Sequence, residues 1–286
     1  MASTVGIIGA GRVGTAVAIA LKDAGFHIVG VASRGAEAES LARKVECERF
    51  GQDACKVISG ADIVFITTPD REIEKVSREI APCIERGVLV AHTSGAYSSR
   101  ILVPIGERGG LCLSMHPCQS FSDLSTAAKR LRGCYFCLEG DNEAVRRGSL
   151  LAEAMKCGSF AVRSEDKTLY HVACSISSNY FIVLVEKALS IFEKIGIGRE
   201  RSLEILMPLL KGTLDNIIDV GVRNALTGPI ERGEVETIRD ELEVIEASIP
   251  ELKDAYVLLG KEALRIAVEK GELPSEVEQT LSELFG

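Results

Sequence analysis

Three glycines near the amino terminus constrain the fold of this chain more than any other feature. Gly9, Gly11 and Gly14 follow the apolar residues 5–8 and open a segment of small residues, 15–21, whose pattern is typical of a helix. In a strand–turn–helix unit, the first glycine permits a tight turn, the second lets the backbone approach a pyrophosphate, and the third allows close helix–strand packing. Free N–H groups at the start of such a helix attract the phosphate. The run therefore predicts a dinucleotide site formed by Gly9, Ala10, Gly11, Arg12, Val13 and Gly14.

Short apolar runs recur in the first 162 residues, with helical or loop stretches between most of them. They lie at 5–8, 28–32, 63–67, 88–91, 111–115, 135–138 and 160–162. Short buried strands that alternate with helices indicate a parallel, doubly wound sheet covered on both faces. Later apolar residues recur with a helical period, at 165–195, 199–224, 235–247, 250–270 and 275–284. We expect an α/β Rossmann-like domain, residues 1–163, and an all-helical domain for substrate binding and dimerisation, residues 164–286, with a cleft between them.

The composition favours a soluble globular protein. Of the 286 residues, 46% are hydrophobic, which is enough for two buried cores. The net charge of −8, without a run of Lys or Arg, argues against a nucleic-acid surface. No signal-like segment precedes the first apolar run, and no apolar stretch approaches the roughly 20 residues that span a bilayer. We therefore expect a cytoplasmic protein with neither a nucleic acid nor a membrane as its partner.

The cysteines indicate thiols rather than a disulfide framework. They are odd in number, and we expect most of them to be buried: Cys47, Cys55, Cys83, Cys112, Cys118, Cys134, Cys137, Cys157 and Cys174. Cys134 and Cys137 form an isolated C-x-x-C, but residues three apart on a strand face opposite sides. A second set of possible ligands has no spacing typical of a closed metal site: Cys112, His116, Cys118 and His92. We predict no metal site.

The end of the second apolar run indicates which dinucleotide binds. NAD-specific proteins of this fold carry Asp or Glu there to bind the ribose 2′-hydroxyl. Here Ser33 and Arg34 follow residues 28–32. A hydroxyl and a guanidinium suit a 2′-phosphate, which predicts NADP as the cofactor. In the alternative interpretation, Arg34 is a solvated surface charge and Glu37 or Glu39 binds the ribose.

Polar residues end three further expected strands, at the edge where open α/β sheets bind ligands. Short hydroxyl side chains and backbone groups there would line the ribose and nicotinamide, although simple turn chemistry remains the alternative. The residues predicted to contact the cofactor are Thr67, Thr68, Pro69, Asp70, Thr93 and Ser94. His116, which precedes Pro117 at the end of another strand, is predicted to contact substrate or cofactor.

The first long helical segment carries a polar face within an otherwise apolar sequence. Its members fall within an arc of about 120°: Lys167, His171, Ser175, Ser178 and Asn179. A hydride transfer needs a proton donor and a group that stabilises negative charge. His171 can donate a proton near neutral pH, Lys167 can stabilise an anion, and Asn179 can orient a ligand. With His116, these three form the predicted catalytic set; the alternative is an exposed helix face that begins near Lys167.

Taken together, these motifs resemble a family of predicted NADP-dependent oxidoreductases, in which a Rossmann-like domain precedes a helical domain of unknown function. The resemblance rests on 9–14, 68–70, 92–95, 116–117, 170–180 and Leu226-Thr227-Gly228-Pro229. It implies an architecture similar to pyrroline-5-carboxylate reductase, ketopantoate reductase and 6-phosphogluconate dehydrogenase, and a homodimer through the helical domain. β-Hydroxyacid dehydrogenases use Lys-x-x-x-Asn on this helix, where the chain has Lys167 and His171. We therefore prefer His171 with Asn179 as the catalytic pair.

The expected function is an NADP(H)-dependent reductase of a small carbonyl or imine that carries a carboxylate, with its chemistry in the interdomain cleft. One alternative is a coenzyme F420-dependent NADP reductase, whose amino-terminal fold is similar. Another is an NADP-binding sensor or scaffold without turnover, which would be favoured if His171 and Asn179 pointed away from the nicotinamide pocket.

Overall fold

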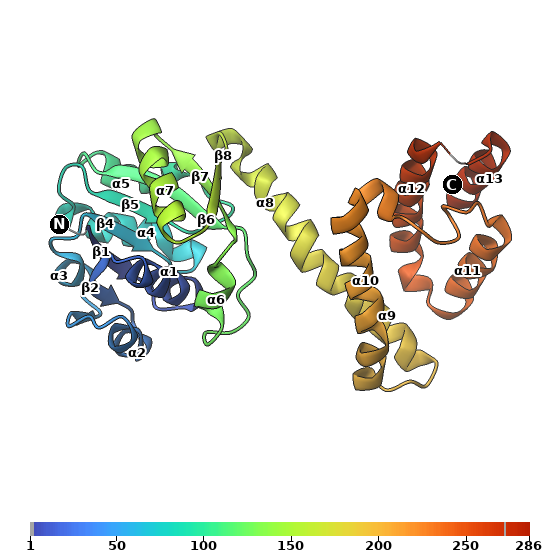
Figure 1. The fold of residues 1–286 in the computed structure, drawn as a ribbon, viewed down its shortest axis with the longest axis horizontal. Coiled ribbons are helices and arrows are strands. Elements are labelled where there is room, and N and C mark those ends of the chain that lie inside the picture. Colours follow the sequence, from blue (N-terminus) through green and yellow to red (C-terminus); the bar gives the residue numbers. More distant parts are fainter. Residues whose placement is uncertain (1–2, 272) are drawn as a thin grey trace. The chain divides into compact units, whose positions relative to one another are not determined.

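The computed structural model describes residues 3–271 and 273–286, which divide into two compact units, Met1–Leu184 and Val185–Gly286. The division falls inside helix α9 (Phe181–Lys194). All strands found in the described residues belong to the first unit, and its last strand ends at Ala161. The change from strands to helices thus lies near residue 163 (Figure 1), whereas the boundary between the two compact units lies further along the chain.

The first unit is built on an eight-stranded sheet of order β3-β2-β1-β4-β5-β6-β7-β8. Its strands are β1 (Thr4–Ile8), β2 (His27–Ala32), β3 (Phe50–Gly51), β4 (Ile63–Ile66), β5 (Leu89–His92), β6 (Leu111–Pro117), β7 (Tyr135–Gly140) and β8 (Gly158–Ala161). The strand order reverses between β1 and β4, and such a switch point opens a ligand crevice at the carboxyl ends of the strands. The sequence predicted seven of these strands; β3 is too short to give a periodic signal.

The prediction of an entirely parallel sheet is wrong at one strand pair. β6 and β7 are antiparallel, with His116 opposite Cys137, whereas every other neighbouring pair is parallel. The connection between them, which includes the short helix α6 (Ala127–Leu131), returns the chain to the edge where β6 ended. No crossover over the sheet is needed, so β7 runs in the opposite direction.

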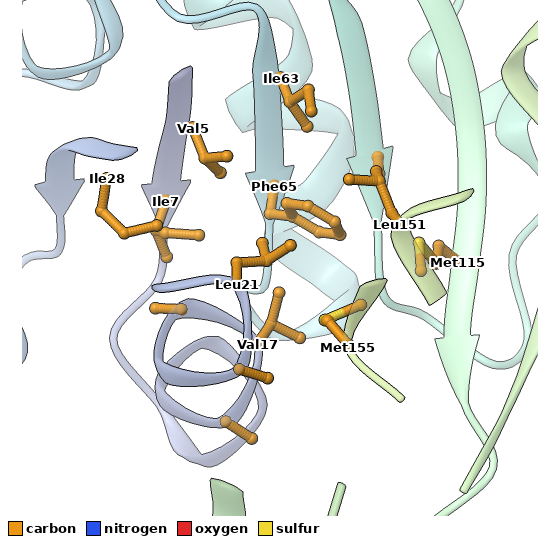
Figure 2. Packing of buried hydrophobic residues seen from close by; sticks show 14 of the residues in the cluster. Val5, Ile7, Val17, Leu21, Ile28, Ile63, Phe65, Met115, Leu151 and Met155 are labelled. Atoms are coloured by element: carbon orange, nitrogen blue, oxygen red, sulfur yellow. The ribbon is translucent and has the colours of Figure 1, made fainter. Parts of the chain in front are cut away.

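Helices cover both faces of this sheet, as the sequence predicted. They are α1 (Arg12–Asp23), α2 (Glu37–Lys44), α3 (Ala54–Ile58), α4 (Asp70–Ile80), α5 (Val103–Gly106), α6 and α7 (Asn142–Ala154). On one face, Ile7 and Phe65 pack with Leu21 of α1, as Figure 2 shows. The opposite face belongs to a separate apolar cluster that includes Ile66 of β4 and Ile73 of α4. Because both faces are buried, the strands are apolar at nearly every position.

A continuous helical stretch follows the sheet. It consists of η3 (Ser164–Asp166), α8 (Lys167–Ser175), the π-helical turn η4 (Ile176–Tyr180) and α9. By length and composition, Ser164–Lys194 is apolar enough to cross a membrane. This finding corrects the expectation that no apolar stretch reaches that length. Uncharged Ser and Asn residues interrupt the apolar run in the sequence, but they lower the mean hydropathy far less than charged residues would.

The second unit is helical, as predicted. Beyond the end of α9, it contains α10 (Arg199–Ala225), α11 (Val235–Ser248), η5 (Pro250–Leu252), α12 (Lys253–Lys270) and α13 (Ser275–Phe285). Its small core joins the last three α-helices: Ile238, Leu264, Leu281 and Phe285 are buried together. Gly260 permits this packing, because a Cβ there would lie 2.5 Å from the ring of Phe285.

One disulfide departs from the predicted free thiols. Cys55 in α3 is bonded to Cys83 at the end of η1 (Ala81–Cys83), with a Cα–Cα distance of 5.6 Å. The two residues lie 28 positions apart, and only the packing of their helices brings them together. The remaining cysteines vary in exposure. Four are buried, Cys112 and Cys174 are half-buried, and Cys118 is exposed.

Candidate functional site

The three glycines between β1 and α1 have different structural roles. Gly9 has a φ of +106°, which an L side chain rarely adopts, and its N–H donates to the carbonyl of Ala32 at 2.7 Å. A Cβ on Gly14 would lie 2.0 Å from the carbonyl oxygen of Gly9, so a larger residue would break the turn. A Cβ on Gly11 would meet nothing within 4 Å. Gly11 therefore borders open space that a ligand can approach closely.

The start of α1 is suited to an anion. Gly11 occupies its N-cap position without a side-chain cap, and the first turn holds no acidic residue. The N–H groups at this end are therefore not neutralised by a carboxylate of the same turn. Arg12 lies beside them and donates from its guanidinium to the carbonyl of Phe121 at 3.3 Å. These features fit a pyrophosphate group.

The end of β4 supports the glycine turn. The hydroxyl of Thr67 donates to the carbonyl of Gly9 at 2.6 Å, which ties the turn to the neighbouring strand. The hydroxyl of Thr68 is buried and has no hydrogen-bond partner among the described residues. An unpaired buried hydroxyl beside an open crevice is a natural contact for a bound polar group.

Two adjoining cavities, of about 660 and 620 Å³, lie along this edge of the sheet. We call them together the cofactor groove. Both are lined by Ala10, Gly11, Glu37, Thr67, Thr68 and Pro69. The first extends to Gly9, Ser33 and Arg34, and the second to Arg12, Val13, Asp70 and Thr93. The groove thus collects nearly all of the predicted cofactor residues; Gly14 lies beneath it as a packing residue.

Opposite charges meet where β2 ends. The side chain of Arg34 is 76% exposed, and its nearest carboxylate is that of Glu72 at 3.6 Å. The carboxylate of Glu37 folds back over Gly35, where a Cβ would lie 2.0 Å from Oε2. Both side chains line the groove. Arg34 can therefore reach a phosphate, while Glu37 retains the competing role of a ribose-binding carboxylate.

The segment after β5 is held by a buried histidine. His92 is fully buried, accepts from the N–H of Ser94 at Nδ1, and pairs through Nε2 with the carbonyl of Ser98 at 3.1 Å. Burial is the main cause that lowers the pKa of His92 to about 4, so this ring is neutral. Ser94 in turn donates to the carboxylate of Asp70 at 2.8 Å. Its hydroxyl is thereby engaged in holding the loop.

Two histidines converge on the glycine that ends this loop. A Cβ on Gly95 would lie 2.4 Å from Nδ1 of His171 and 2.9 Å from Nε2 of His116. The two rings are 5.8 Å apart between centroids. Nδ1 of His116 is hydrogen-bonded to the hydroxyl of Tyr170 at 2.8 Å. We refer to His116, Tyr170 and His171, gathered around Gly95, as the histidine cluster.

The electrostatic environment keeps the cluster's bonded pair uncharged. Burial, followed by the positive charge of Lys167, lowers the pKa of His116 to about 3. Burial and a hydrogen bond with Cys174 raise the pKa of Tyr170 far above its ordinary value. A neutral imidazole and a protonated phenol therefore share this hydrogen bond at physiological pH. Both groups keep their protonation state, so the hydrogen bond serves to position the His116 ring.

The other predicted catalytic residues lie at different distances from this cluster. Lys167 is 1% exposed; its Nζ is 3.7 Å from Sγ of Cys137 and 5.2 Å from the centre of the Tyr170 ring. Burial lowers its pKa. Nδ1 of His171 is buried without a hydrogen-bond partner among the described residues. Asn179 is exposed in the π-helical turn, and no described contact joins it to the cluster.

Tyr170 is the member of the histidine cluster that the predicted site residues did not include. It lies three residues after Lys167 and directly before His171, in a segment whose spacing marked those two residues. A tyrosine on a mostly apolar helix usually packs in a core, and only the hydrogen bond to the distant His116 makes Tyr170 a candidate site residue. Within residues 3–271 and 273–286, no three His, Cys, Asp or Glu side chains are grouped to hold a metal ion.

A larger cavity, of about 930 Å³, lies at the opposite edge of the sheet. Asp62, Gly87 and Arg147 line it, together with the disulfide-bonded Cys55 and Cys83. Asp62 and Gly87 precede β4 and β5, so this cavity faces the amino ends of the strands. Ligands of open α/β sheets bind at the carboxyl ends, which favours the cofactor groove as the site.

This arrangement defines a Rossmann-like dinucleotide-binding unit, and sequence comparison agrees. The Rossmann-like domain family matches residues 2–117. A domain of unknown function, DUF2520, matches residues 134–263. The chain therefore combines a Rossmann-like domain with a DUF2520 domain, which confirms the architecture that its motifs predicted. The second match begins before β7, so it includes the last two strands of the sheet.

Solved structures share this fold over nearly their whole length. A proposed NADP oxidoreductase from Bacteroides fragilis has a TM-score of 0.73 at 24% identity, covering 92% of this chain and 98% of that chain. A protein from Thermotoga maritima, whose name states no activity, has a TM-score of 0.73 at 28% identity, covering 91% and 98%. A pyrroline-5-carboxylate reductase from Coxiella burnetii has a TM-score of 0.62 at 16% identity, covering 99% of both chains. The chain has the fold of this group of proteins.

Proposed function

We propose that this protein is an NADP(H)-dependent oxidoreductase that transfers a hydride to or from a small carbonyl or imine carrying a carboxylate. One juxtaposition carries the proposal. The segment after β5 places Thr93 in the cofactor groove and, two residues later, Gly95 against His116 and His171. A single short loop thus borders both a dinucleotide-shaped groove and a pair of proton-carrying rings. The nicotinamide, when bound, supplies or accepts the hydride.

The cluster supplies the proton that such a reaction requires. Reduction of a carbonyl or imine leaves an oxygen or nitrogen that must be protonated. We assign this donation to His171, whose buried Nδ1 has no described partner. The Tyr170–His116 hydrogen bond holds the neighbouring ring in place. Lys167 contributes a buried positive charge beneath Tyr170, which favours a substrate carboxylate or a developing oxyanion.

The preference for NADP over NAD rests on Arg34. Its guanidinium is largely exposed and lies at the long distance of 3.6 Å from the carboxylate of Glu72, so it is available for a 2′-phosphate. The carboxylate of Glu37 lies over Gly35 on the same side of the groove. A 2′-phosphate would be attracted by Arg34 and repelled by Glu37. We therefore propose that the attraction by Arg34 exceeds the repulsion by Glu37, which gives the preference for NADP over NAD.

We also propose a cytoplasmic homodimer formed through the helical unit. Helix α10 exposes large apolar side chains: Leu209 is 65% exposed, Ile218 is 78% and Val222 is 63%. A folded monomer rarely leaves such a surface in water. The same helix carries exposed Asp215 and Asp219, which suit a protein partner better than a bilayer interior. Light scattering should give the mass of a dimer, Ile218→Asp should give a monomer, and the control Lys211→Glu should remain dimeric.

The activity is tested by following NADPH oxidation with a panel of 2-oxo acids, cyclic imines and a deazaflavin. Turnover of an oxo acid or imine is expected. Turnover of only the deazaflavin would instead identify an F420-dependent reductase. Tight NADPH binding without turnover across the panel would favour a sensor. Absence of binding to NADPH and NADH alike would overturn the assignment of the groove.

A further inference from the structure

We infer that Cys118 and Cys174 form a reversible oxidation site at the edge of the histidine cluster. A peroxide converts the two thiols to a disulfide that ties the end of β6 to α8. The formation of this bond does not depend on the proposed activity. Only its effect on turnover rests on the proposed function.

The geometry of the two sulfur atoms carries this inference. Sγ of Cys118 and Sγ of Cys174 are 3.7 Å apart, although the residues are separated by 56 positions. A disulfide needs about 2.05 Å, so the sulfur atoms must approach by roughly 1.6 Å. The backbone N–H of Cys118 donates to the carbonyl of Tyr135 at 2.8 Å, which fixes it beside β7. Cys174 is held in the last turn of α8.

Exposure distinguishes this pair from the other thiols. Cys118 is exposed and Cys174 is half-buried. A small oxidant can therefore reach Sγ of Cys118, and Sγ of Cys174 lies next to it. Cys134 and Cys157 are buried, and Cys137 is buried against Lys167. An accessible thiol next to a resolving thiol is the arrangement found at oxidation-sensitive sites.

The reaction balances with hydrogen peroxide as the oxidant. The thiolate of Cys118 attacks one peroxide oxygen, the O–O bond breaks, and a sulfenic acid and hydroxide form. Sγ of Cys174 then attacks the sulfenic sulfur, and the S–OH oxygen leaves as water. Together the two sulfur atoms lose two electrons, which the peroxide oxygens gain, and two water molecules are released. A dithiol reductant reverses the bond by exchange.

The disulfide would alter the histidine cluster through one residue. The hydroxyl of Tyr170 is hydrogen-bonded to His116, and Cys174 lies one helical turn further along α8. Drawing Sγ of Cys174 toward Cys118 displaces the helical turn that begins at Tyr170. The 2.8 Å hydrogen bond between Tyr170 and His116 is then lengthened or lost. Oxidation is therefore expected to lower turnover while leaving the cofactor groove intact.

The test treats the full-length protein with hydrogen peroxide and maps its peptides by mass spectrometry without reduction. A cross-linked peptide pair containing Cys118 and Cys174 is expected, and it should disappear after dithiothreitol. It should be absent in Cys118→Ser and Cys174→Ser. Cys112→Ser is the matched control, because its half-buried thiol donates to the carbonyl of Leu102 and should leave the cross-link unchanged. Peptide mapping also separates the new bond from Cys55–Cys83.

Two outcomes would overturn the inference. One is oxidation of Cys118 to sulfinic acid without a cross-link, and the other is a Cys118 bond between two chains. NADPH affinity, measured on the same samples, should be unchanged by oxidation. If a substrate is found, turnover should fall at least about tenfold and return on reduction. A cross-link without an effect on turnover would support the oxidation site but contradict the proposed role of Tyr170.

Discussion

The phenol of Tyr170 and the imidazole of His116 are joined by a 2.8 Å hydrogen bond, although 54 residues separate them. The bond connects β6, which lies in the sheet, to α8, the helix that follows it. It places a neutral, hydrogen-bonded pair beside the loop that borders the cofactor groove.

Replacing Tyr170 with Phe should lower turnover by about 10- to 100-fold, because the hydroxyl that orients His116 is lost. NADPH affinity, measured by fluorescence titration, should remain unchanged. Tyr180→Phe is the matched control, since that tyrosine lies on the same helical stretch and is 61% exposed. Equal losses in the two variants would exclude a specific role for the Tyr170 hydroxyl.

Replacing His171 with Ala should depress turnover by about 100-fold or more while leaving the affinity for NADPH within a factor of about three. The reason is that its Nδ1 faces the Gly95 region and has no described protein partner. Steady-state kinetics and equilibrium titration separate the two effects. His27→Ala, at the exposed start of β2, serves as the control. Normal turnover in His171→Ala would remove this residue as the proton donor.

The charge at the end of β2 should set cofactor choice. Arg34→Asp is expected to weaken NADPH binding by about 10- to 100-fold and to improve NADH binding, because a 2′-phosphate would meet two carboxylates. Arg71→Asp is the comparison, since Arg71 also contacts Glu72 but does not line the groove. Unchanged NADPH affinity in Arg34→Asp would leave Arg34 as a surface charge.

Two glycines of one turn should respond oppositely to alanine. Gly14→Ala places a Cβ 2.0 Å from the Gly9 carbonyl and should destabilise the folded protein by about 1–3 kcal/mol. Gly11→Ala places a Cβ in open space, so stability should persist while cofactor affinity falls. Thermal unfolding and NADPH titration measure the two properties. Similar stability losses in both variants would contradict the separate roles.

Acid should destabilise the first unit through its buried histidines. The pKa of His92 is lowered from 6.5 to about 4 in the folded state. Below pH 6.5 the unfolded chain therefore binds more protons at this residue than the folded chain, and stability falls as the pH falls toward 4. From pH 7 to pH 5, His92 alone should contribute a loss of about 2 kcal/mol.

Denaturant unfolding followed by circular dichroism measures this dependence. His92→Gln should be less stable at pH 7 but should show a shallower loss toward pH 5 than the unmodified protein. His27→Gln, at an exposed position, should keep the full slope. If His92→Gln and the unmodified protein lose stability in parallel, the buried ring is not the titrating group.

Most of the fold could be predicted from the sequence, because the patterns that indicate its helices and strands are local. The glycine turn before α1 and each apolar strand can be recognised from a pattern that spans about ten residues. The helices of the second unit could be predicted equally well, because their apolar residues recur with a helical period. The short strand β3 and the reversed direction of β7 depend on what each segment pairs with. No local pattern encodes that partner.

In the candidate site, too, some residues could be predicted from local patterns and others depend on contacts between distant segments. Residues at the carboxyl ends of strands, such as Thr68 and His116, were predictable because parallel strands deliver their ends to one edge. Helical spacing also pointed to His171. The same spacing grouped Asn179 with it, but Asn179 is exposed and has no described contact with the cluster. Tyr170 depended on a contact across 54 residues, which spacing alone cannot reveal.

The antiparallel return from β6 to β7 has a consequence for how this protein family can diversify. Because β7 starts where β6 ends, the intervening residues stay at the ligand edge, and Phe121 and Leu124 line the cofactor groove. A loop in this position can change length or composition without disturbing the registers of the strands around it. Relatives could thus acquire new ligands by altering one connection while the sheet around it remains the same.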